Sequence, residues 1–407
     1  MKHTSARPGT VSARPSSPPR GARPKSLTAA VLTLGAVVLS SLTFSTGPAN
    51  ATTPSSVVPS RNDRAALEAA LKDVVAAGVP GIIVRAQDPD RAPRRHAVGV
   101  ADLTTGHPLR PSAQFRAGSV TKTFVATVVL QLVGEGQLRL DDPISRTLPG
   151  LLANGDQITV RQLLNHTSGL PDYILNPELF AGIVQNRIWM PRELVALAAT
   201  HPPRFAPGTA WEYSNTNYIV AGLLIEAVTQ HPVARALERR IFTPLRLGHT
   251  SFPAADEPLT GYHAHGYLST ETIPTADGQP LDVTGYNPSH AWAAGALVSN
   301  ADDLSSFYRA LMTGKLLSAP LLKQMTTTIP EDPTDPNNTF SYGLGLERVQ
   351  DTCGANWGHT GSIYGYQDLA YWNEHTGRTV VIASTMSPAP AAADAPLATA
   401  TDLALCH

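Results

Sequence analysis

The sequence predicts an α/β (α+β) protein with an antiparallel sheet built from both ends of the chain, flanked by helices, and an all-α lobe beside it. Segments with strand patterns lie near the start of the chain, at 81–101, and again near its end, at 343–383. Between them, residues 123–325 have mostly helical patterns broken by Pro and Gly. A chain of 407 residues with 42% hydrophobic content can bury a large core, here divided between two lobes.

The first 51 residues differ from the rest of the chain. They contain six basic residues and no acidic residue, then an apolar run over 27–42 and the small-residue triplet Ala49-Asn50-Ala51. This order predicts a secretory signal peptide over 1–51, cleaved after Ala51, and an extracellular mature protein without a stable membrane anchor. An uncleaved membrane anchor is the alternative, because the apolar run is long enough for a marginal span. Residues 52–61 are rich in Thr, Ser and Pro and are predicted to be flexible.

Loss of the leader would make the protein acidic. The whole chain has 31 basic and 32 acidic residues, so removing six basic residues leaves 25 against 32, a net charge of −7. Such a balance argues against nucleic-acid binding and against a polybasic membrane surface. We expect a monomer.

The helices and strands expected along the chain support the predicted fold. The domain covers 62–407, with an α/β lobe from 62–122 and 340–407 and a helical lobe from 123–339. The elements that we expect in this domain are a helix over 63–76, strands over 81–86 and 96–101, helices over 123–133, 160–165, 193–199, 218–228 and 304–313, strands over 343–346, 365–372 and 378–383, and a last helix over 396–405.

A Ser-x-x-Lys pair opens the helix predicted at 123. Ser119 and Lys122 are three residues apart, a spacing that brings two side chains onto one helical face. A serine hydroxyl needs a base to become a nucleophile, and a partly desolvated lysine can act as that base. Taken alone, the pair can equally be a capping serine followed by a surface lysine.

Two further segments could contribute to the same site. Tyr213 and Asn215 precede the helix over 218–228, and both could point into one cleft, where a nearby ammonium would lower the pKa of a tyrosine enough for proton transfer. The segment Trp357-Gly358-His359-Thr360-Gly361-Ser362 lies where strand patterns resume. On a strand edge it could bind a carboxylate and direct a backbone N–H at a reacting carbonyl.

A predicted turn and a pair of cysteines bear on the structure around these segments. Asn165-His166-Thr167-Ser168-Gly169 follows a predicted helix, and we interpret it as a turn. Cys353 and Cys406 are the chain's two cysteines, and in an exported protein such a pair indicates a disulfide rather than a metal site or a catalytic thiol.

Taken together, Ser119-Val120-Thr121-Lys122, Tyr213-Ser214-Asn215 and His359-Thr360-Gly361 resemble the motif set of the serine β-lactamase/penicillin-binding protein superfamily. His-Thr-Gly as the third motif is similar to the secreted D-alanyl-D-alanine carboxypeptidases, and the Cys353/Cys406 pair also resembles that group. The resemblance implies a β-lactamase/DD-peptidase-like fold and a serine-type carboxypeptidase acting through an acyl-enzyme, without metal or organic cofactor. It implies peptidoglycan stem peptides or D-amino-acid peptides as partners, and β-lactams as inhibitors or substrates.

The resemblance also implies a role for each motif residue. Ser119 is the expected nucleophile, Lys122 its proton acceptor, and Tyr213 the acid toward the leaving amine. The expected substrate-binding residues are Asn215 at the substrate amide, Trp292 at the cleft wall, His359, Thr360 and Gly361 at the terminal carboxylate, and Ser362 with its N–H in the oxyanion hole. If His359 binds the carboxylate as an imidazolium, Michaelis constants should rise as the pH passes about 6.5.

One position departs from the resemblance. Close relatives of this kind tend to have Arg after Gly-Leu-Gly-Leu, whereas Glu347 stands here, followed by Arg348. A glutamate facing the cleft would repel a substrate carboxylate. The alternatives on the same fold are a β-lactamase, an esterase or a D-aminopeptidase, and a non-catalytic penicillin- or peptide-binding sensor is an alternative of another class.

Overall fold

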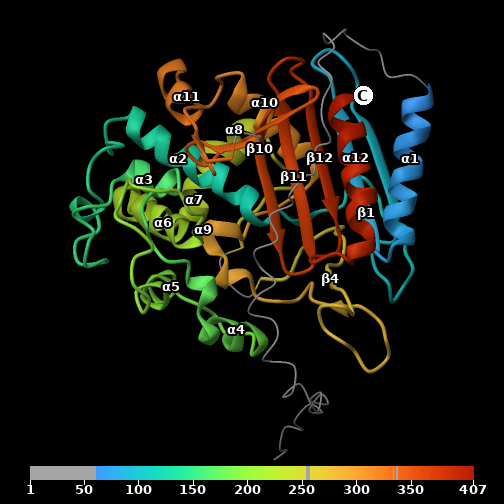
Figure 1. Cartoon of the computed structure of the whole chain (residues 1–407), viewed down its shortest axis with the longest axis horizontal. Helices are drawn as coiled ribbons and strands as arrows, with labels where there is room; N and C mark the ends of the chain where they lie inside the picture. Colours follow the sequence, from blue (N-terminus) through green and yellow to red (C-terminus); the bar gives the residue numbers. More distant parts are fainter. Residues whose placement is uncertain (1–60, 254–256, 333, 336–337) are drawn as a thin grey trace, which may run out of the picture.

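In the computed structural model, an eight-stranded antiparallel sheet joins the two ends of the chain (Figure 1). The structure describes residues 61–253, 257–332, 334–335 and 338–407. The order β2-β1-β12-β11-β10-β9-β8-β7 places the N-terminal strands beside the last strand of the chain. Its strands are β1 (Gly81–Gln87), β2 (Arg94–Gly99), β7 (Ile329–Pro330), β8 (Phe340–Tyr342), β9 (Glu347–Asp351), β10 (Gly354–Ile363), β11 (Tyr366–Asn373) and β12 (Thr379–Ser384).

Helices cover both faces of this sheet. One face packs on α1 and α12, and the other packs on α10 and the helical lobe (Figure 1). The helices are α1 (Arg61–Ala76), α2 (Thr121–Gly134), α3 (Val160–Leu164), α4 (Pro177–Val184), α5 (Pro191–Ala198), α6 (Asn215–Thr229), α7 (Val233–Leu237), α8 (Thr243–Leu245), α9 (Trp292–Gly295), α10 (Ala301–Met312), α11 (Ala319–Met325) and α12 (Asp394–Cys406). Short strand pairs link β3 (Phe115–Arg116) to β6 (Val298–Ser299) and β4 (Tyr267–Leu268) to β5 (Leu281–Asp282).

Helix α2 lies at the junction of the lobes. Its sequence is apolar on almost every side, and most of its residues are buried. Phe124 of α2 stacks on Phe307 of α10, with ring centroids 3.6 Å apart. A helix that is apolar all round belongs in a core, so the residues just before α2 are held rigidly.

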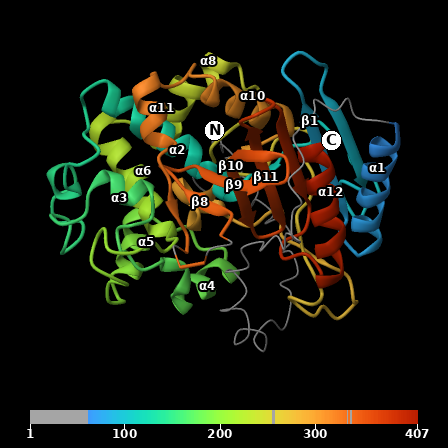
Figure 2. The same cartoon turned by 45° about the horizontal axis from the view of Figure 1, so that its top comes forward.

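The β-lactamase/DD-peptidase-like architecture predicted from the sequence is confirmed, with mixed helices and an antiparallel sheet. The strand predicted at 343–346 is wrong. Gly343 N–H donates to Leu346 O across a tight turn, and Gly345 has a φ of +75°. A Cβ at Gly345 would lie 2.4 Å from Ala126 Cβ, so the turn approaches α2 closely. Leu344 and Leu346 mimic strand alternation because both are buried in this turn. Strands β8 and β9 flank the turn on the side of the helical lobe (Figure 2).

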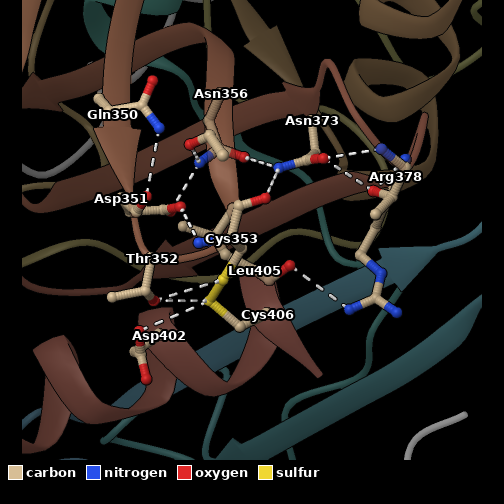
Figure 3. The surroundings of a disulfide bond; sticks show 12 residues. Gln350, Asp351, Thr352, Cys353, Asn356, Asn373, Arg378, Asp402, Leu405 and Cys406 are labelled. Atoms are coloured by element: carbon tan, nitrogen blue, oxygen red, sulfur yellow. Dashed lines mark hydrogen bonds between the residues drawn. A yellow bond between two sulfur atoms is a disulfide. The ribbon is translucent and has the colours of Figure 1, made fainter. Parts of the chain in front are cut away.

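The predicted disulfide is confirmed. Cys353, in the turn between β9 and β10, is bonded to Cys406 at the end of α12, with Cα atoms 5.4 Å apart (Figure 3). Asn356 Nδ2 donates to Asp351 beside the bridge at 2.6 Å, and Asn373 Nδ2 donates to Asn356 Oδ1 at 2.9 Å. The bridge therefore fixes the start of β10, the strand that contains His359, to the last helix.

Two predictions fall outside the described residues. The leader over 1–51 is one, and the segment over 52–61 is the other, except for position 61, where α1 begins. Among the described residues, none of the helices has both the length and the apolar character needed to cross a membrane.

Candidate active site

The Ser-x-x-Lys pair forms as the sequence predicts. A short 3-10 turn over Gly118–Val120 leads into α2, so Ser119 and Lys122 are one helical turn apart. Lys122 Nζ lies 2.9 Å from Ser119 Oγ, 2.8 Å from Asn215 Oδ1 and 2.8 Å from Ala294 O. These three acceptors fix the amine beside the hydroxyl of Ser119.

Lys122 is completely buried. Burial lowers the pKa of Lys122 from its ordinary value of 10.5 to about 7, although the negative charges of Asp172 and Glu347 act in the opposite direction. A large fraction of the amine is therefore neutral near pH 7, and its lone pair can accept the proton of Ser119.

Tyr213 joins this pair. Lys122 Nζ lies 4.9 Å from the centroid of the tyrosine ring, and the Ser119 side chain is close enough to lower the pKa of Tyr213. Burial raises the pKa of Tyr213 well above 10, with a smaller opposing effect of the Ser119 side chain. The direction is opposite to the one expected from the sequence, because desolvation outweighs the nearby ammonium. Tyr213 is a protonated phenol in this site, suited to donate a proton.

Asn215 begins α6 and is fixed on both sides of its amide. Its Oδ1 accepts from Lys122, and its Nδ2 donates to Asp172 Oδ2 at 2.8 Å. The backbone N–H of Asn215 donates to the same oxygen at 3.0 Å. Burial raises the pKa of Asp172, and the N–H donors of Asn215 and Ile174 oppose that rise. Asp172 was not predicted from the sequence, because only its position in a Pro-Asp-Tyr turn could have pointed to it.

Strand β10 approaches the nucleophile through two glycines. A Cβ at Gly118, which has a φ of +45°, would lie 2.7 Å from the backbone N of Ser362. A Cβ at Gly361 would lie 2.4 Å from Ala117 O. Only glycine allows this approach, which brings the N–H of Ser362 alongside the turn that carries Ser119. That position suits an oxyanion hole.

The His-Thr motif is engaged within the protein. Thr360 donates its N–H to Glu347 Oε2 at 2.8 Å and its hydroxyl to Glu347 Oε1 at 2.9 Å. Glu347 is 3% exposed and also accepts from the Tyr371 hydroxyl at 2.7 Å. The groups expected to bind a substrate carboxylate are therefore bound to a carboxylate of the protein itself.

His359 does not fit the imidazolium expected from the sequence. Its Nδ1 lies 2.6 Å from Thr360 O and 3.2 Å from Glu347 Oε1, so this nitrogen carries the proton. Its Nε2 then accepts from the Tyr342 hydroxyl at 2.8 Å. Burial lowers the pKa of His359 below 6.5 despite the charge of Glu347. We therefore expect Michaelis constants that do not change through the pH range in which an exposed histidine titrates.

Trp292 also differs from its expected role. It is 5% exposed, and a Cβ at Gly222 in α6 would lie 2.6 Å from its ring. Trp292 packs into the core at the start of α9 rather than forming an open cleft wall. Its neighbour Ala294 supplies the carbonyl that accepts from Lys122.

The turn over 165–169 forms as predicted, directly after α3. Its His166 is completely buried, and its ring centroid lies 4.3 Å from that of Tyr213. This contact was not predicted from the sequence, because no local pattern links residue 166 to residue 213.

Comparison with known proteins identifies the family. A family model described as Beta-lactamase matches residues 65–403. The chain belongs to the beta-lactamase family. It is a serine hydrolase of the β-lactamase and penicillin-binding protein superfamily, as the three motifs predict.

Two solved structures resemble this family member over nearly their whole length. A D-stereospecific amidohydrolase from Streptomyces sp. is 37% identical, with a TM-score of 0.76, over 84% of this chain and 98% of that one. The D-amino acid amidase from Ochrobactrum anthropi SV3, complexed with L-phenylalanine amide, is 30% identical, with a TM-score of 0.75, over 84% of this chain and 98% of that one.

Curated relatives in the family match over shorter spans. Esterase EstB from Burkholderia gladioli is 35% identical over 204 residues, 46% of this chain and 48% of the esterase. Penicillin-binding protein 4 from Amycolatopsis lactamdurans is 31% identical over 218 residues, 52% of this chain and 54% of that protein. The matched region spans about half the length of these two relatives.

Proposed function

We propose that this protein is a serine amidohydrolase that cleaves amides and short peptides whose acyl group is a D-amino acid with a free ammonium group. The observation that carries the proposal is the buried carboxylate of Glu347, which accepts from both donors of Thr360. A substrate carboxylate at this strand edge would have to displace those contacts and lie beside a like charge. An amide has no such charge.

The charges around the nucleophile also favour a cationic substrate. With a pKa of about 7, Lys122 carries only part of a positive charge near neutral pH. The negative charges of Asp172 and Glu347 both act on it. A site that is net negative attracts an ammonium group and repels a carboxylate.

The hydrolysis uses three side chains. Neutral Lys122 takes the proton of Ser119 as its Oγ attacks the amide carbon, and the N–H groups of Ser119 and Ser362 stabilise the oxyanion. The C–N bond breaks as Tyr213 gives its proton to the leaving nitrogen, and the proton held by Lys122 restores the phenol. In deacylation, the Tyr213 hydroxyl passes the proton of the attacking water to Lys122, and Lys122 returns a proton to Ser119 Oγ as the ester bond breaks, so that Lys122 is neutral again.

The proposed preference for D-configured acyl groups is supported by the similar solved structures. The two solved structures similar over 98% of their length are by title a D-stereospecific amidohydrolase and a D-amino acid amidase. Their titles support D-configured acyl groups as the first substrates to test.

A D-Ala-D-Ala carboxypeptidase is the second candidate. Ser362 is exposed one residue beyond Gly361, and its hydroxyl, 2.9 Å from that of Ser387, is the group that would bind a terminal carboxylate in this reaction. Cell-wall stem peptides and β-lactams would then be the ligands. Secretion stays part of the proposal and is supported by the disulfide, because such bonds persist in oxidising compartments.

A substrate panel tests the proposal. Amides of D- and L-amino acids, a D-Ala-D-Ala-ended peptide and benzylpenicillin are compared by kcat/KM, and intact mass follows the adduct on Ser119. We expect D-amino acid amides to be the best substrates and Ser119→Ala to lose both turnover and adduct. Preference for the D-Ala-D-Ala peptide would refute the proposal in favour of the second candidate, and rapid penicillin turnover would indicate a β-lactamase. Preference for simple esters would indicate an esterase, and the absence of both turnover and adduct with every substrate would indicate a binding protein.

A further inference from the structure

The segment that carries Tyr213 is held by one residue from a distant part of the chain. His166 O accepts from Glu212 N–H at 3.1 Å, and His166 Nδ1 accepts from Ser214 N–H at 3.2 Å. The backbone on both sides of Tyr213 is thus bound to His166. The two rings also pack together, with an interplanar angle of 31°.

The backbone of His166 explains how it makes both contacts. Its φ of +62° is left-handed, a conformation that is uncommon for residues other than Gly and in which Asn, Asp and His are the most frequent of the others. In this conformation the carbonyl and the ring of His166 reach the same segment. Strain of this kind persists where surrounding contacts over-determine it.

The hydrogen bonds fix the tautomer of His166. Ser168 Oγ donates to Asn217 Oδ1 at 2.5 Å, which leaves Asn217 Nδ2 to donate to His166 Nδ1 at 3.0 Å. With two donors at Nδ1, the proton of a neutral ring lies on Nε2. Burial holds the pKa of His166 well below 6.5, and the charges of Lys122 and His359 act in the same direction. The ring therefore supports Tyr213 without adding charge to the site.

We propose that His166 is a positioning residue that sets the Tyr213 hydroxyl at the distance from Ser119 needed to protonate the leaving group. The inference rests on the proposed function, in which Tyr213 is that acid. His166 acts through Tyr213 and not on the reacting atoms. Its contribution is confined to steps in which Tyr213 transfers a proton.

Leaving-group dependence tests this role. An amide needs a proton on its leaving nitrogen, whereas a p-nitrophenyl ester of the same D-amino acid leaves as a stable anion. The comparison uses kcat/KM, which reports steps up to acylation. His166→Gly removes the ring and the Nδ1 acceptor but keeps the left-handed backbone unstrained. His166→Asn tolerates the same backbone and restores an acceptor oxygen near the position of Nδ1.

We expect His166→Gly to lower kcat/KM about 100-fold for the amide and less than about fivefold for the ester, within the range of general acid catalysis. His166→Asn should recover at least about tenfold of the amide activity. Thr167→Val is the matched control, since it removes a buried hydrogen bond of the same turn, from Thr167 Oγ1 to Asn165 Oδ1 at 2.7 Å, without touching Tyr213. It should leave the amide-to-ester ratio unchanged.

Tyr213→Phe is the reference for the outcome. Suppose that Tyr213→Phe lowers kcat/KM for the amide much more than for the ester. If His166→Gly then lowers both values equally, or if His166→Asn recovers no amide activity relative to His166→Gly, the inference on His166 is wrong and the proposed function stands. If the wild type cleaves neither substrate, or Tyr213→Phe lowers both equally, the role of Tyr213 fails, and that of His166 fails with it. Thermal melts of each variant show that the fold is retained.

Discussion

Lys122 gives the sharpest test of the proposed chemistry, because its burial couples activity to stability. The pKa falls from 10.5 to about 7 on folding, so the unfolded chain binds more protons than the folded one between these values. The free energy of unfolding should therefore rise with pH from about 7 to about 10.5. Below about pH 7 the full penalty applies, about 5 kcal/mol for a shift of this size at about 1.4 kcal/mol per pH unit.

The variant Lys122→Met isolates this effect. It removes the buried charge but leaves Asn215 Oδ1 and Ala294 O without their donor, at a cost of about 1 to 3 kcal/mol each that does not vary with pH. At a single pH, the difference in the free energy of unfolding between the two proteins therefore does not report the pKa of Lys122. The change of that difference with pH does. Relative to the variant, the wild type should gain about 2 kcal/mol between about pH 7 and about pH 9.

Urea denaturation of both proteins at several pH values measures the change. Titrating groups that do not interact with Lys122 cancel in the difference, since they are the same in the two chains. In parallel, kcat/KM of the wild type should rise as the pH passes through about 7, as Lys122 loses its proton. A stability difference that stays constant within about 0.5 kcal/mol would refute the lowered pKa and with it the assignment of Lys122 as the base.

Three further predictions test other parts of the site. Glu347→Gln should lower the Michaelis constant for a D-Ala-D-Ala-ended peptide about tenfold and raise that for a D-amino acid amide, and unchanged constants would contradict the charge argument. Gly361→Ala should lower kcat about 100-fold, because the new Cβ pushes β10 from Ala117; full activity would disprove the close approach. Replacing Cys353 and Cys406 together by Ser should lower the free energy of unfolding in urea by about 4 kcal/mol for a loop of 53 residues, and no loss would argue against chain entropy as the origin.

Much of the fold could be predicted from the sequence, because long helices and buried strands leave periodic patterns. Helix α6 and strands β11 and β12 form within a few residues of their predicted bounds. The turn at 343–346 was misjudged, since its buried leucines alternate as strand residues do. What distinguishes it is the approach of Gly345 to α2, a contact between segments about 220 residues apart in the chain that no local pattern records.

In the candidate site too, contacts between residues close in the sequence could be predicted, and contacts between distant segments could not. The contact between Ser119 and Lys122 follows from helical spacing alone and could be predicted. The support of Asn215 by Asp172 and the contact of His166 with Tyr213 join distant segments and could not be predicted. The protonation states of the site residues were the hardest feature to predict, because they depend on burial, which the sequence does not give directly.

Glu347 links specificity to catalysis through one charge. Its carboxylate holds Thr360 and at the same time raises the pKa of Lys122 against the effect of burial. Glu347→Gln should therefore shift the acid limb of kcat/KM toward lower pH, because less negative charge stabilises the ammonium. A local loss of packing would change kcat/KM at every pH equally and leave the midpoint in place. If the variant alters the substrate preference but not the pH midpoint of kcat/KM, Glu347 acts on the substrate alone. If the preference and the midpoint both change, the same carboxylate selects the substrate and determines the pKa of Lys122.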